Sequence, residues 1–579
     1  MSTTDMAGAQ KEFLGHPRGL VILFFTEMWE RFSFYGMRAL LVLYLTQHFL
    51  FGDGEAQGIY ASYAALVYLM PVIGGIIADR FLGSRKAVII GALLLVAGHF
   101  TMAFEGSGGR EFIQHQGQEY RIEAVGRDAD RQLFAVDAER RVPITITPEG
   151  ISASGPATPV VGATAASAVP FPATIPTGGY QIRKEVDGTG QATLFLALSL
   201  IVVGVGFLKP NISTVVGALY AEGDTRRDAG FTIFYVGINL GSVLATLLCG
   251  GLGIAYGWKY GFGLAGFGML AGLLTFLWGQ KWLEGRAEPP ATANLHKTFL
   301  GVPRQAAIYI GGIIAVIPIW MLLQRHHVVE VALTWLVPAI FAGLLLYSAI
   351  AIKGDGRWKM LAAIILTMFS VLFWTLFEQA GSSLTLFADR STELPSWLNA
   401  SQTNFFNPGM IVIFGPLMAG LWIWLGKRGL EPNVPMKFAI GLMLVGAGFL
   451  ALVWGANHHA NELFRVSWLF LLAAYFLHTM GELCLSPVGL SMITKLSVAR
   501  MVGLMMGAWF MASALAHTLA GIVAQMTSSE TVGGVVTDPE AALATYATVF
   551  NQIGWAGVIV GVVLLALSPV LKWMMKGVK

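Results

Sequence analysis

Residues 20–49, LVILFFTEMWERFSFYGMRALLVLYLTQHF, form an apolar run that is long enough to cross a bilayer. The run also carries four charged side chains, those of Glu27, Glu30, Arg31 and Arg38. A charge at bilayer depth costs about 2.5 to 3.5 kcal/mol on insertion scales. On a helix, Glu27, Arg31 and Arg38 fall within about 80° of one another. We therefore expect a membrane-spanning helix with one polar face that points away from lipid.

The composition excludes a soluble globular protein. Of 579 residues, 55% are hydrophobic and 12% are charged, against roughly 25% charged in a soluble chain, and the mean hydropathy is +0.65. The formal net charge of +3 does not favour nucleic-acid binding. Cys249 and Cys484 both lie in apolar runs, which argues against a disulfide framework or a metal site of the CxxC type.

Fourteen stretches are long and apolar enough to span a membrane. They lie near residues 20–49, 57–81, 86–105, 190–219, 227–255, 259–283, 305–323, 331–352, 359–388, 404–426, 435–455, 467–496, 499–526 and 548–574. An even number of spans returns both termini to one side. Most basic residues of the short loops fall on that side, among them Arg80, Arg85, Lys86, Lys427 and Lys572, so we place it in the cytoplasm. We predict a multi-pass protein of the plasma membrane, which in a bacterium is the inner membrane.

The segment 106–188 interrupts this pattern after the third span and is therefore expected on the extracytoplasmic face. Residues 120–125, 132–136 and 142–147 alternate between apolar and polar side chains, as short strands do. Residues 152–179 are rich in Ala, Ser, Pro, Thr and Gly. We expect a small β-rich module followed by a flexible strap. Either a decorative insertion or a lid over the substrate path fits this segment.

The spans near 305–323 and 331–352 hold no charged residue, whereas spans that carry the function should contain some. We therefore interpret these two spans as an accessory hairpin between two six-helix halves. This 6+2+6 layout resembles an all-α membrane protein of the major facilitator fold. The predicted organisation is a cytoplasmic tail (1–19), an N-terminal six-helix bundle (20–283, interrupted by the insertion), a linker with the accessory hairpin (284–358), and a C-terminal six-helix bundle with a short cytoplasmic tail (359–579).

Seven charged side chains lie at bilayer depth and come from both halves: Glu27, Glu30, Arg31, Arg38, Lys209, Glu378 and Glu482. Because charges of both signs on four spans are poorly explained by snorkelling at helix ends, we expect them to converge on a water-filled cavity. The four carboxylates exceed the three cations by one. The carboxylate without a partner is expected to bind a proton when the pairs rearrange, which a proton-coupled carrier requires.

Separated charges of opposite sign suit a zwitterionic solute, such as an amino acid or a short peptide, better than a sugar or a lipid. Trp374 and Trp509 are candidates to line side-chain pockets, together with Ser513 and His517 on the face of Trp509, although helix packing explains the tryptophans equally well. Asp79 and Arg80, at the cytoplasmic end of the second span, resemble the gating loop of the major facilitator superfamily. The alternative is that this loop has no gating role and that its basic residue only marks the cytoplasmic face of the membrane, as basic residues in short loops commonly do.

The stretch Glu27-Met-Trp-Glu-Arg-Phe-Ser-Phe-Tyr-Gly36 is similar to the ExxERFxYYG signature of the proton-dependent oligopeptide transporter (POT, or PTR2) family. Further similar motifs are Lys209-Pro-Asn211, Phe377-Glu-Gln379 with Gly381-Ser-Ser383, Asn407-Pro408 and residues 481–491. The resemblance covers the whole chain except the insertion. It implies import of di- and tripeptides by alternating access, in symport with protons.

The resemblance also implies roles for individual residues. Proton coupling would belong to Glu27, Glu30 and Arg31. The peptide carboxylate would bind Arg38 and Lys209, and its amino terminus would bind Asn239, Asn407 and Glu482. Tyr35 and Tyr68 would line the cavity. Salt bridges between Arg38 and Glu378, and between Lys209 and Glu482, would close the outer and the cytoplasmic gate.

Two positions depart from the family pattern. Phe34 replaces the first tyrosine of the YYG element, which removes one hydroxyl from the cavity. Ala61 stands where mammalian-type members carry a proton-sensing histidine. Protons must then rely on carboxylates, chiefly Glu27 and Glu30, with Glu378 as a further candidate.

The sequence contains no Ser/His/Asp set and no metal-ligand set that would support catalysis, so we expect a carrier rather than an enzyme, with the proton as coupling ion and no cofactor or metal. Two alternatives stay open. One is a proton-coupled carrier of another zwitterionic or anionic solute. The other is a membrane receptor whose β module senses a ligand while the helices no longer transport.

Overall fold

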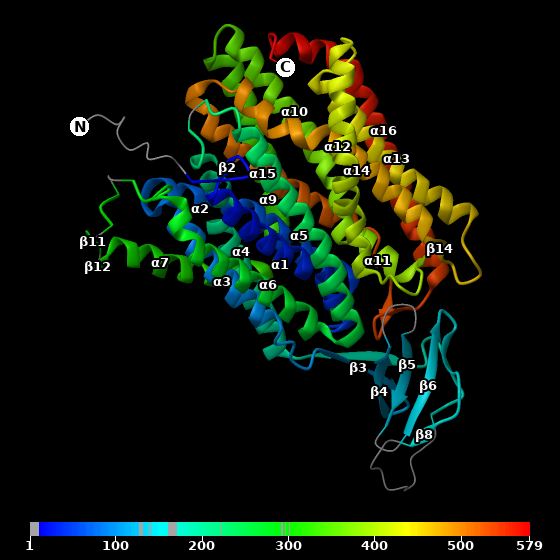
Figure 1. Cartoon of the computed structure of the whole chain (residues 1–579). Helices are drawn as coiled ribbons and strands as arrows, with labels where there is room; N and C mark the ends of the chain where they lie inside the picture. The colour runs from blue at the N-terminus through cyan, green and yellow to red at the C-terminus, as the bar shows by residue number, and fades with distance from the viewer. Residues whose placement is uncertain are drawn as a thin grey trace.

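The computed structural model describes residues 11–126, 131–137, 140–159, 171–221, 223–290, 293–295, 297–299 and 301–578. Helices dominate the fold (Figure 1). The N-terminal half contains α1 (Gly19–Gln47), α2 (Asp53–Ile77), α3 (Gly83–Met102), α4 (Gly188–Ala218), α5 (Arg227–Tyr256) and α6 (Trp258–Trp278). The accessory hairpin contains α7 (Arg304–Ile314), α8 (Val316–Gln324) and α9 (His326–Ala351).

The C-terminal half contains α10 (Asp355–Phe377), α11 (Ser383–Arg390), α12 (Phe406–Lys427), α13 (Val434–His458), α14 (Trp468–Leu496), α15 (Val502–Gln525) and α16 (Pro539–Met574). Short tight turns complete several spans: the π-helical turn η1 (Ala78–Leu82) follows α2, the 3-10 turn η5 (Glu378–Gly381) joins α10 to α11, and η6 (Ser401–Phe405) precedes α12.

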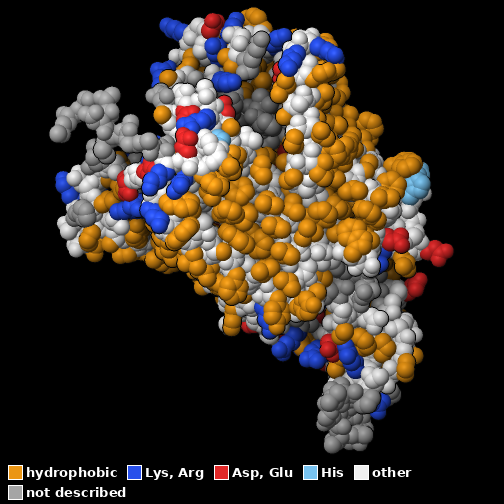
Figure 2. All heavy atoms as spheres, viewed as in Figure 1, with side chains coloured by type: hydrophobic (Ala, Val, Ile, Leu, Met, Phe, Trp, Pro, Cys, Tyr) orange, Lys and Arg blue, Asp and Glu red, His pale blue; other side chains and the backbone are white. Residues whose placement is uncertain are grey.

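Twelve helical stretches of the described residues are long and apolar enough to cross a membrane, and one of them, Asp53–Met102, contains both α2 and α3. α1 is not among the twelve, because its four charges lower its apolar character. Counting α2 and α3 separately and adding α1 gives the fourteen spans that the sequence predicts. Figure 2 shows a broad belt of hydrophobic side chains around the helices, as expected of a surface that faces lipid.

Several helices begin where the sequence supplies a capping side chain. Asp187 accepts a hydrogen bond from the backbone N–H of Thr189 at the start of α4. Asn433 and Asp538 do the same for α13 and α16, each followed closely by a proline in the first turn. Such residues satisfy backbone donors that a helix leaves unpaired at its N-terminus.

The packing confirms the 6+2+6 architecture. Within the N-terminal half α1 packs against α5 and α6, and α3 packs against α4; within the C-terminal half α13 packs against α14 and α16. The halves meet where α2 contacts α15 and where α5 contacts α12 and η6. The accessory hairpin lies against both halves, through α8 on α4 and α9 on α15. The residue limits of these units stay a prediction, and residues 1–10 of the expected tail lie outside the described residues.

The β-rich insertion between α3 and α4 is present. Its strands are β3 (Gly109–His115), β4 (Gln118–Val125), β5 (Gln132–Val136), β6 (Arg140–Thr147), β7 (Gly150–Ala153), β8 (Thr158–Pro159), β9 (Thr174–Pro176) and β10 (Gln181–Val186). They form one antiparallel sheet in the order β10-β3-β4-β5-β6-β7-β9, with β8 beside β6. Part of the expected strap thus adds strands to the sheet, and residues 160–170 of the strap lie outside the described residues.

This β module contacts both halves of the helical body. On the N-terminal side, the backbone N–H of Gly109 donates to the carbonyl oxygen of His48 at 2.7 Å. On the C-terminal side, the hairpin of β15 (Thr531–Val532) and β16 (Val535–Val536), which joins α15 to α16, inserts Val532 into the apolar core of the module. Arg131 reaches both sides, since its Nε donates to the carbonyl oxygen of Gly533 at 2.7 Å and its Nη2 to that of Gln47 at 2.9 Å.

The contact at Gly533 is close and buried. Its N–H donates to Oε2 of Glu111 at 2.6 Å, and burial raises the pKa of the Glu111 carboxyl although this hydrogen bond lowers it. Gly533 has a φ of 58°, and a Cβ there would lie 2.6 Å from Cδ2 of the buried Leu133. The hairpin therefore needs a glycine at this position.

Replacing Gly533 with valine is expected to loosen the hairpin from the module. A side chain in the left-handed region costs roughly 1 to 2 kcal/mol, before Leu133 is displaced. Deuterium exchange of the backbone amides in residues 529–538 should become about 5- to 30-fold faster. Gly117→Val is the matched control, because Gly117 has a φ of 78° and a Cβ there would have no heavy atom within 4 Å. Equal exchange of the hairpin in both variants would show that the Gly533 contact does not hold it.

Candidate functional site

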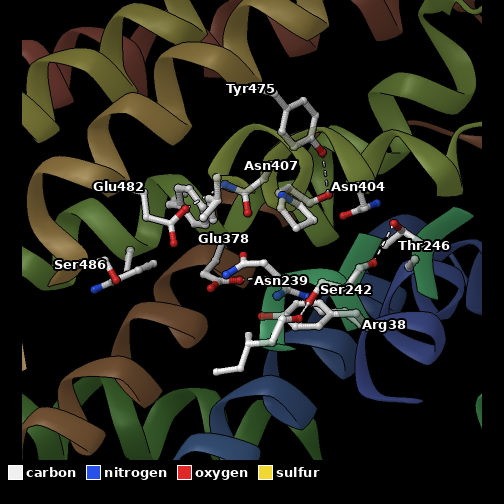
Figure 3. Close-up of a pocket in the computed structure, with 18 of the residues that line it drawn as sticks. Arg38, Asn239, Ser242, Thr246, Glu378, Asn404, Asn407, Tyr475, Glu482 and Ser486 are labelled. Carbon is white, nitrogen blue, oxygen red and sulfur yellow. Dashed lines mark hydrogen bonds and ion pairs between the residues drawn. The ribbon is translucent and has the colours of Figure 1, made fainter. Parts of the chain in front are cut away.

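A cavity of about 170 Å³ lies between the two halves of the helical body. This volume far exceeds the roughly 15 Å³ that one water molecule needs, so a small solute fits. Its polar lining residues are Tyr35, Arg38, Tyr68, Tyr235, Asn239, Ser242, Thr246, Glu378, Asn404, Asn407, Tyr475, Glu482 and Ser486. In Figure 3, Arg38, Asn239 and Ser242 of the N-terminal half face Asn407 and Glu482 of the C-terminal half across Glu378.

Arg38 and Glu378 join the two halves at this cavity. Nη2 of Arg38 pairs with Oε2 of Glu378, and the two side chains are only 14% and 7% exposed. Nε of Arg38 also donates to the hydroxyl oxygen of Tyr60 at 2.6 Å. Gly381 allows this arrangement, because a Cβ at that position would lie 1.8 Å from the Tyr60 hydroxyl oxygen. Gly381 of the motif Gly381-Ser-Ser383 therefore supplies space for the buried ion pair.

Glu482 supplies negative charge from the opposite half. It lies midway along α14, is buried, and accepts a hydrogen bond at Oε2 from Nδ2 of Asn407 at 2.8 Å. Nδ2 of Asn407 also donates to Oγ1 of Thr479 at 3.1 Å. The amide thus fixes the carboxylate at the wall of the cavity, which Glu482 lines.

Glu27, Glu30 and Arg31 form a second charged cluster, about 10 Å farther along α1 from Arg38, away from the insertion. Nε of Arg31 lies 3.0 Å from Oε1 of Glu27, and Arg31 also pairs with Glu30. All three are nearly fully buried, so two carboxylates share one guanidinium out of water. The cluster is separate from the lining of the main cavity.

Lys209 lies between the cluster and the cavity. Its Nζ lies 3.8 Å from the centre of the Tyr68 ring, which lines the cavity. Among the described residues no salt bridge joins Lys209 to Glu482; Glu482 instead bonds to Asn407. The expected salt bridge between these two residues on the cytoplasmic side stays a prediction.

A side pocket of about 110 Å³ adjoins the main cavity and shares Tyr68, Trp374 and Glu378 with it. Its remaining lining residues are Trp509, Ser513 and His517, all from α15. The helical spacing noted in the sequence does bring these three together. Asp79 and Arg80, by contrast, lie exposed in η1, at the end of α2 that points away from the insertion.

Sequence reasoning missed several polar residues of the cavity and one buried ion pair. Ser242 and Thr246 follow Asn239 at i+3 and i+7 on α5, a spacing that places them on one helix face. Asp53 and Arg390 form a bidentate pair between the halves, with Nη2 and Oδ1 2.8 Å apart and side-chain exposures of 0% and 6%. No local pattern signals that pair, because 337 positions separate its members.

The described residues contain no group of three or more His, Cys, Asp or Glu side chains that could hold a metal ion. Two six-helix halves around a polar, charged cavity define a membrane carrier of the major facilitator type. The chain belongs to the POT family, which matches residues 85–539. This is the family that the sequence motifs indicate, and its members are transporters rather than enzymes.

Related proteins cover nearly the whole chain. The uncharacterized transporter YclF of Bacillus subtilis (strain 168) is 34% identical, over 98% of this chain and 97% of its own. A di-/tripeptide transporter of Lactococcus lactis subsp. cremoris is 31% identical, over 98% of each chain. A crystal structure of a variant of a POT peptide transporter in complex with alafosfalin is 31% identical, covers 98% of each chain and superposes with a TM-score of 0.72.

Proposed function

We propose that this protein imports di- and tripeptides by alternating access, driven by the inward movement of protons down their gradient. The observation that carries the proposal is the cavity between the halves, with the Arg38 guanidinium on one side and the Glu482 carboxylate on the other. Family membership and the names of the permease relatives support it. A zwitterionic peptide would present its carboxylate to Arg38 and Lys209, and its ammonium to Glu482, Asn239 and Asn407.

Arg38 has two competing partners in this scheme. In the structure it pairs with Glu378, and a substrate carboxylate would take the place of Glu378 on the same guanidinium. Substrate binding and separation of this ion pair are therefore linked, which is how a carrier avoids opening both sides of its cavity at once. Tyr35, Tyr68, Trp374, Trp509 and Ser513 would surround the peptide side chains.

The buried cluster of Glu27, Glu30 and Arg31 supplies a place for the coupling proton. Glu27 and Glu30 carry two negative charges against one positive charge in a buried site. A single proton on either carboxylate balances that cluster. Proton uptake and release at Glu27 or Glu30 would then move Arg31 between its partners. The proton is the only coupling ion that we propose, and no cofactor is needed.

We propose that the insertion side is extracytoplasmic and that both termini are cytoplasmic, in the inner membrane of a bacterium. Lys and Arg side chains gather at the end of the helical body that lies away from the β module (Figure 2). On this assignment the pairs Arg38–Glu378 and Asp53–Arg390 close the outer side. Lys209 and Glu482 would pair when the cytoplasmic side closes, with Asp79 and Arg80 in the cytoplasmic gating loop.

Purified protein in liposomes is expected to accumulate labelled dialanine only when an inward-directed proton gradient is imposed. Collapse of the gradient with a protonophore should lower the initial uptake rate at least tenfold. Uptake that is independent of the gradient would contradict proton coupling. Flux that is blocked by another zwitterion or anion but not by peptides would indicate a different solute, and peptide binding without flux would indicate a receptor.

A further inference from the structure

His517 reaches the ion pair between Arg38 and Glu378 from the C-terminal half. Its Nδ1 lies 3.8 Å from Oε2 of Glu378, the same oxygen that pairs with Arg38. The imidazole is only 5% exposed and lines the side pocket. A buried histidine that faces an ionised carboxylate can gain a proton at physiological pH, which no other unperturbed side chain does so readily.

The groups that face His517 come from four other elements: Glu378 from η5, Arg38 from α1, Tyr68 from α2 and Lys209 from α4. The centres of the His517 and Tyr68 rings are 4.6 Å apart, and Lys209 contacts the same tyrosine ring. His517 thus faces one carboxylate and two cations, and only the carboxylate belongs to its own half of the protein.

This division between halves matters when the outer gate opens. α15 packs directly against η5, so His517 and Glu378 stay together as the C-terminal half moves. Arg38, on α1, moves away with the N-terminal half. A buried carboxylate that loses its ion-pair partner carries a penalty of several kcal/mol. A protonated imidazole already in place can remove that penalty.

We propose that His517 is the second partner of Glu378 in the transport cycle. It binds one proton from the outer solution as Arg38 leaves, holds the Glu378 carboxylate while the outer side is open, and releases that proton into the cavity when Arg38 returns. One proton is bound on opening and one is released on closing, and Glu378 stays ionised throughout. His517 is a positioning residue for the gate, and its role rests on the proposed proton-coupled transport.

The first test measures opening of the outer side as a function of pH, without any substrate. Spin labels on Glu55→Cys and Ser396→Cys, both exposed and on opposite halves, report the distance across that side; the two native cysteines, Cys249 and Cys484, are buried. In His517→Gln, opening must wait for a proton on Glu378 itself, and a carboxyl group holds a proton less tightly than an imidazole. We expect the midpoint of opening to shift at least one pH unit to the acid side.

His478→Gln is the matched control, because His478 is a buried histidine of the same half that packs on Phe449 instead of on the gate. The pH midpoint of His478→Gln should equal that of the parent. The decisive comparison is Glu378→Gln with and without His517→Gln. Since a neutral glutamine needs no cation, the second substitution should produce no further shift if His517 acts through Glu378.

An unchanged midpoint in His517→Gln, or an equal shift in the Glu378→Gln background, would overturn the proposal. His517→Asn is subject to the same criteria and replaces His517→Gln if that variant does not fold. Dialanine uptake by the parent protein separates this result from the proposed function. A parent that opens with pH but moves no peptide refutes peptide transport alone, whereas normal uptake with an unshifted His517→Gln profile refutes only the role of His517.

Discussion

Replacing Glu482 with glutamine is expected to lower proton-driven uptake of dialanine at least thirtyfold. The carboxylate is buried midway along α14 and is held by Asn407, so it is placed to receive a peptide ammonium. Removing one partner of such a buried charge pair costs about 2 to 5 kcal/mol, and each 1.4 kcal/mol is a factor of ten. The loss should be measured as the ratio of kcat/KM values in proteoliposomes.

Two comparisons make this result specific. Glu462→Gln removes a carboxylate from an exposed loop and should leave uptake unchanged. N-acetyl-dialanine, which lacks the ammonium group, should inhibit the parent and Glu482→Gln equally poorly. Uptake of dialanine by Glu482→Gln at the parental rate would exclude Glu482 from binding the amino terminus.

Replacing Arg390 with glutamine is expected to open the outer side of the protein. Asp53 and Arg390 are both nearly inaccessible to solvent and tie α2 to the end of α11. Loss of the arginine leaves the Asp53 carboxylate buried without its cation, at a cost of about 3 to 5 kcal/mol. That cost falls on the closed state, so the ratio of open to closed molecules should rise at least a hundredfold.

Distances between spin labels at Glu55→Cys and Ser396→Cys should therefore lengthen in Arg390→Gln. Arg465→Gln is the control, because Arg465 lines the same pocket of about 160 Å³ as Arg390, whereas the salt bridge of Asp53 is to Arg390. Adding Asp53→Asn to Arg390→Gln removes the unpaired charge and should restore the shorter distance. If the distance stays short in Arg390→Gln, this pair does not hold the outer side closed.

Much of the fold was predictable because membrane spans are local features. A helix in lipid must satisfy its own backbone hydrogen bonds and present apolar side chains over about 20 residues. Both properties can be recognised within a single segment of the sequence. The alternation of residues 120–125, 132–136 and 142–147 predicted strands where β4, β5 and β6 form. The strap was expected to be flexible, but β8 and β9 pair with the sheet, and that pairing depends on neighbours rather than on local composition.

The candidate site was predictable only in part. Charges in apolar spans marked Arg38, Glu378 and Glu482, and the structure places all three at one cavity. Glu27, Glu30 and Arg31 form their own cluster instead of lining that cavity, because they lie about two turns farther along α1. The roles of all these residues in transport stay predictions until flux is measured.

By itself, the sequence determined the membrane class, the number of spans, the family and the identity of the charged residues that must avoid lipid. The tertiary structure alone decided which of those charges meet: Arg38 with Glu378, Asp53 with Arg390, and His517 beside the same carboxylate as Arg38. It also placed Val532 in the core of a module encoded some 400 positions earlier. The physical reason is that burial and periodicity act within one helix, whereas a contact between residues far apart in the chain depends on how the helices dock.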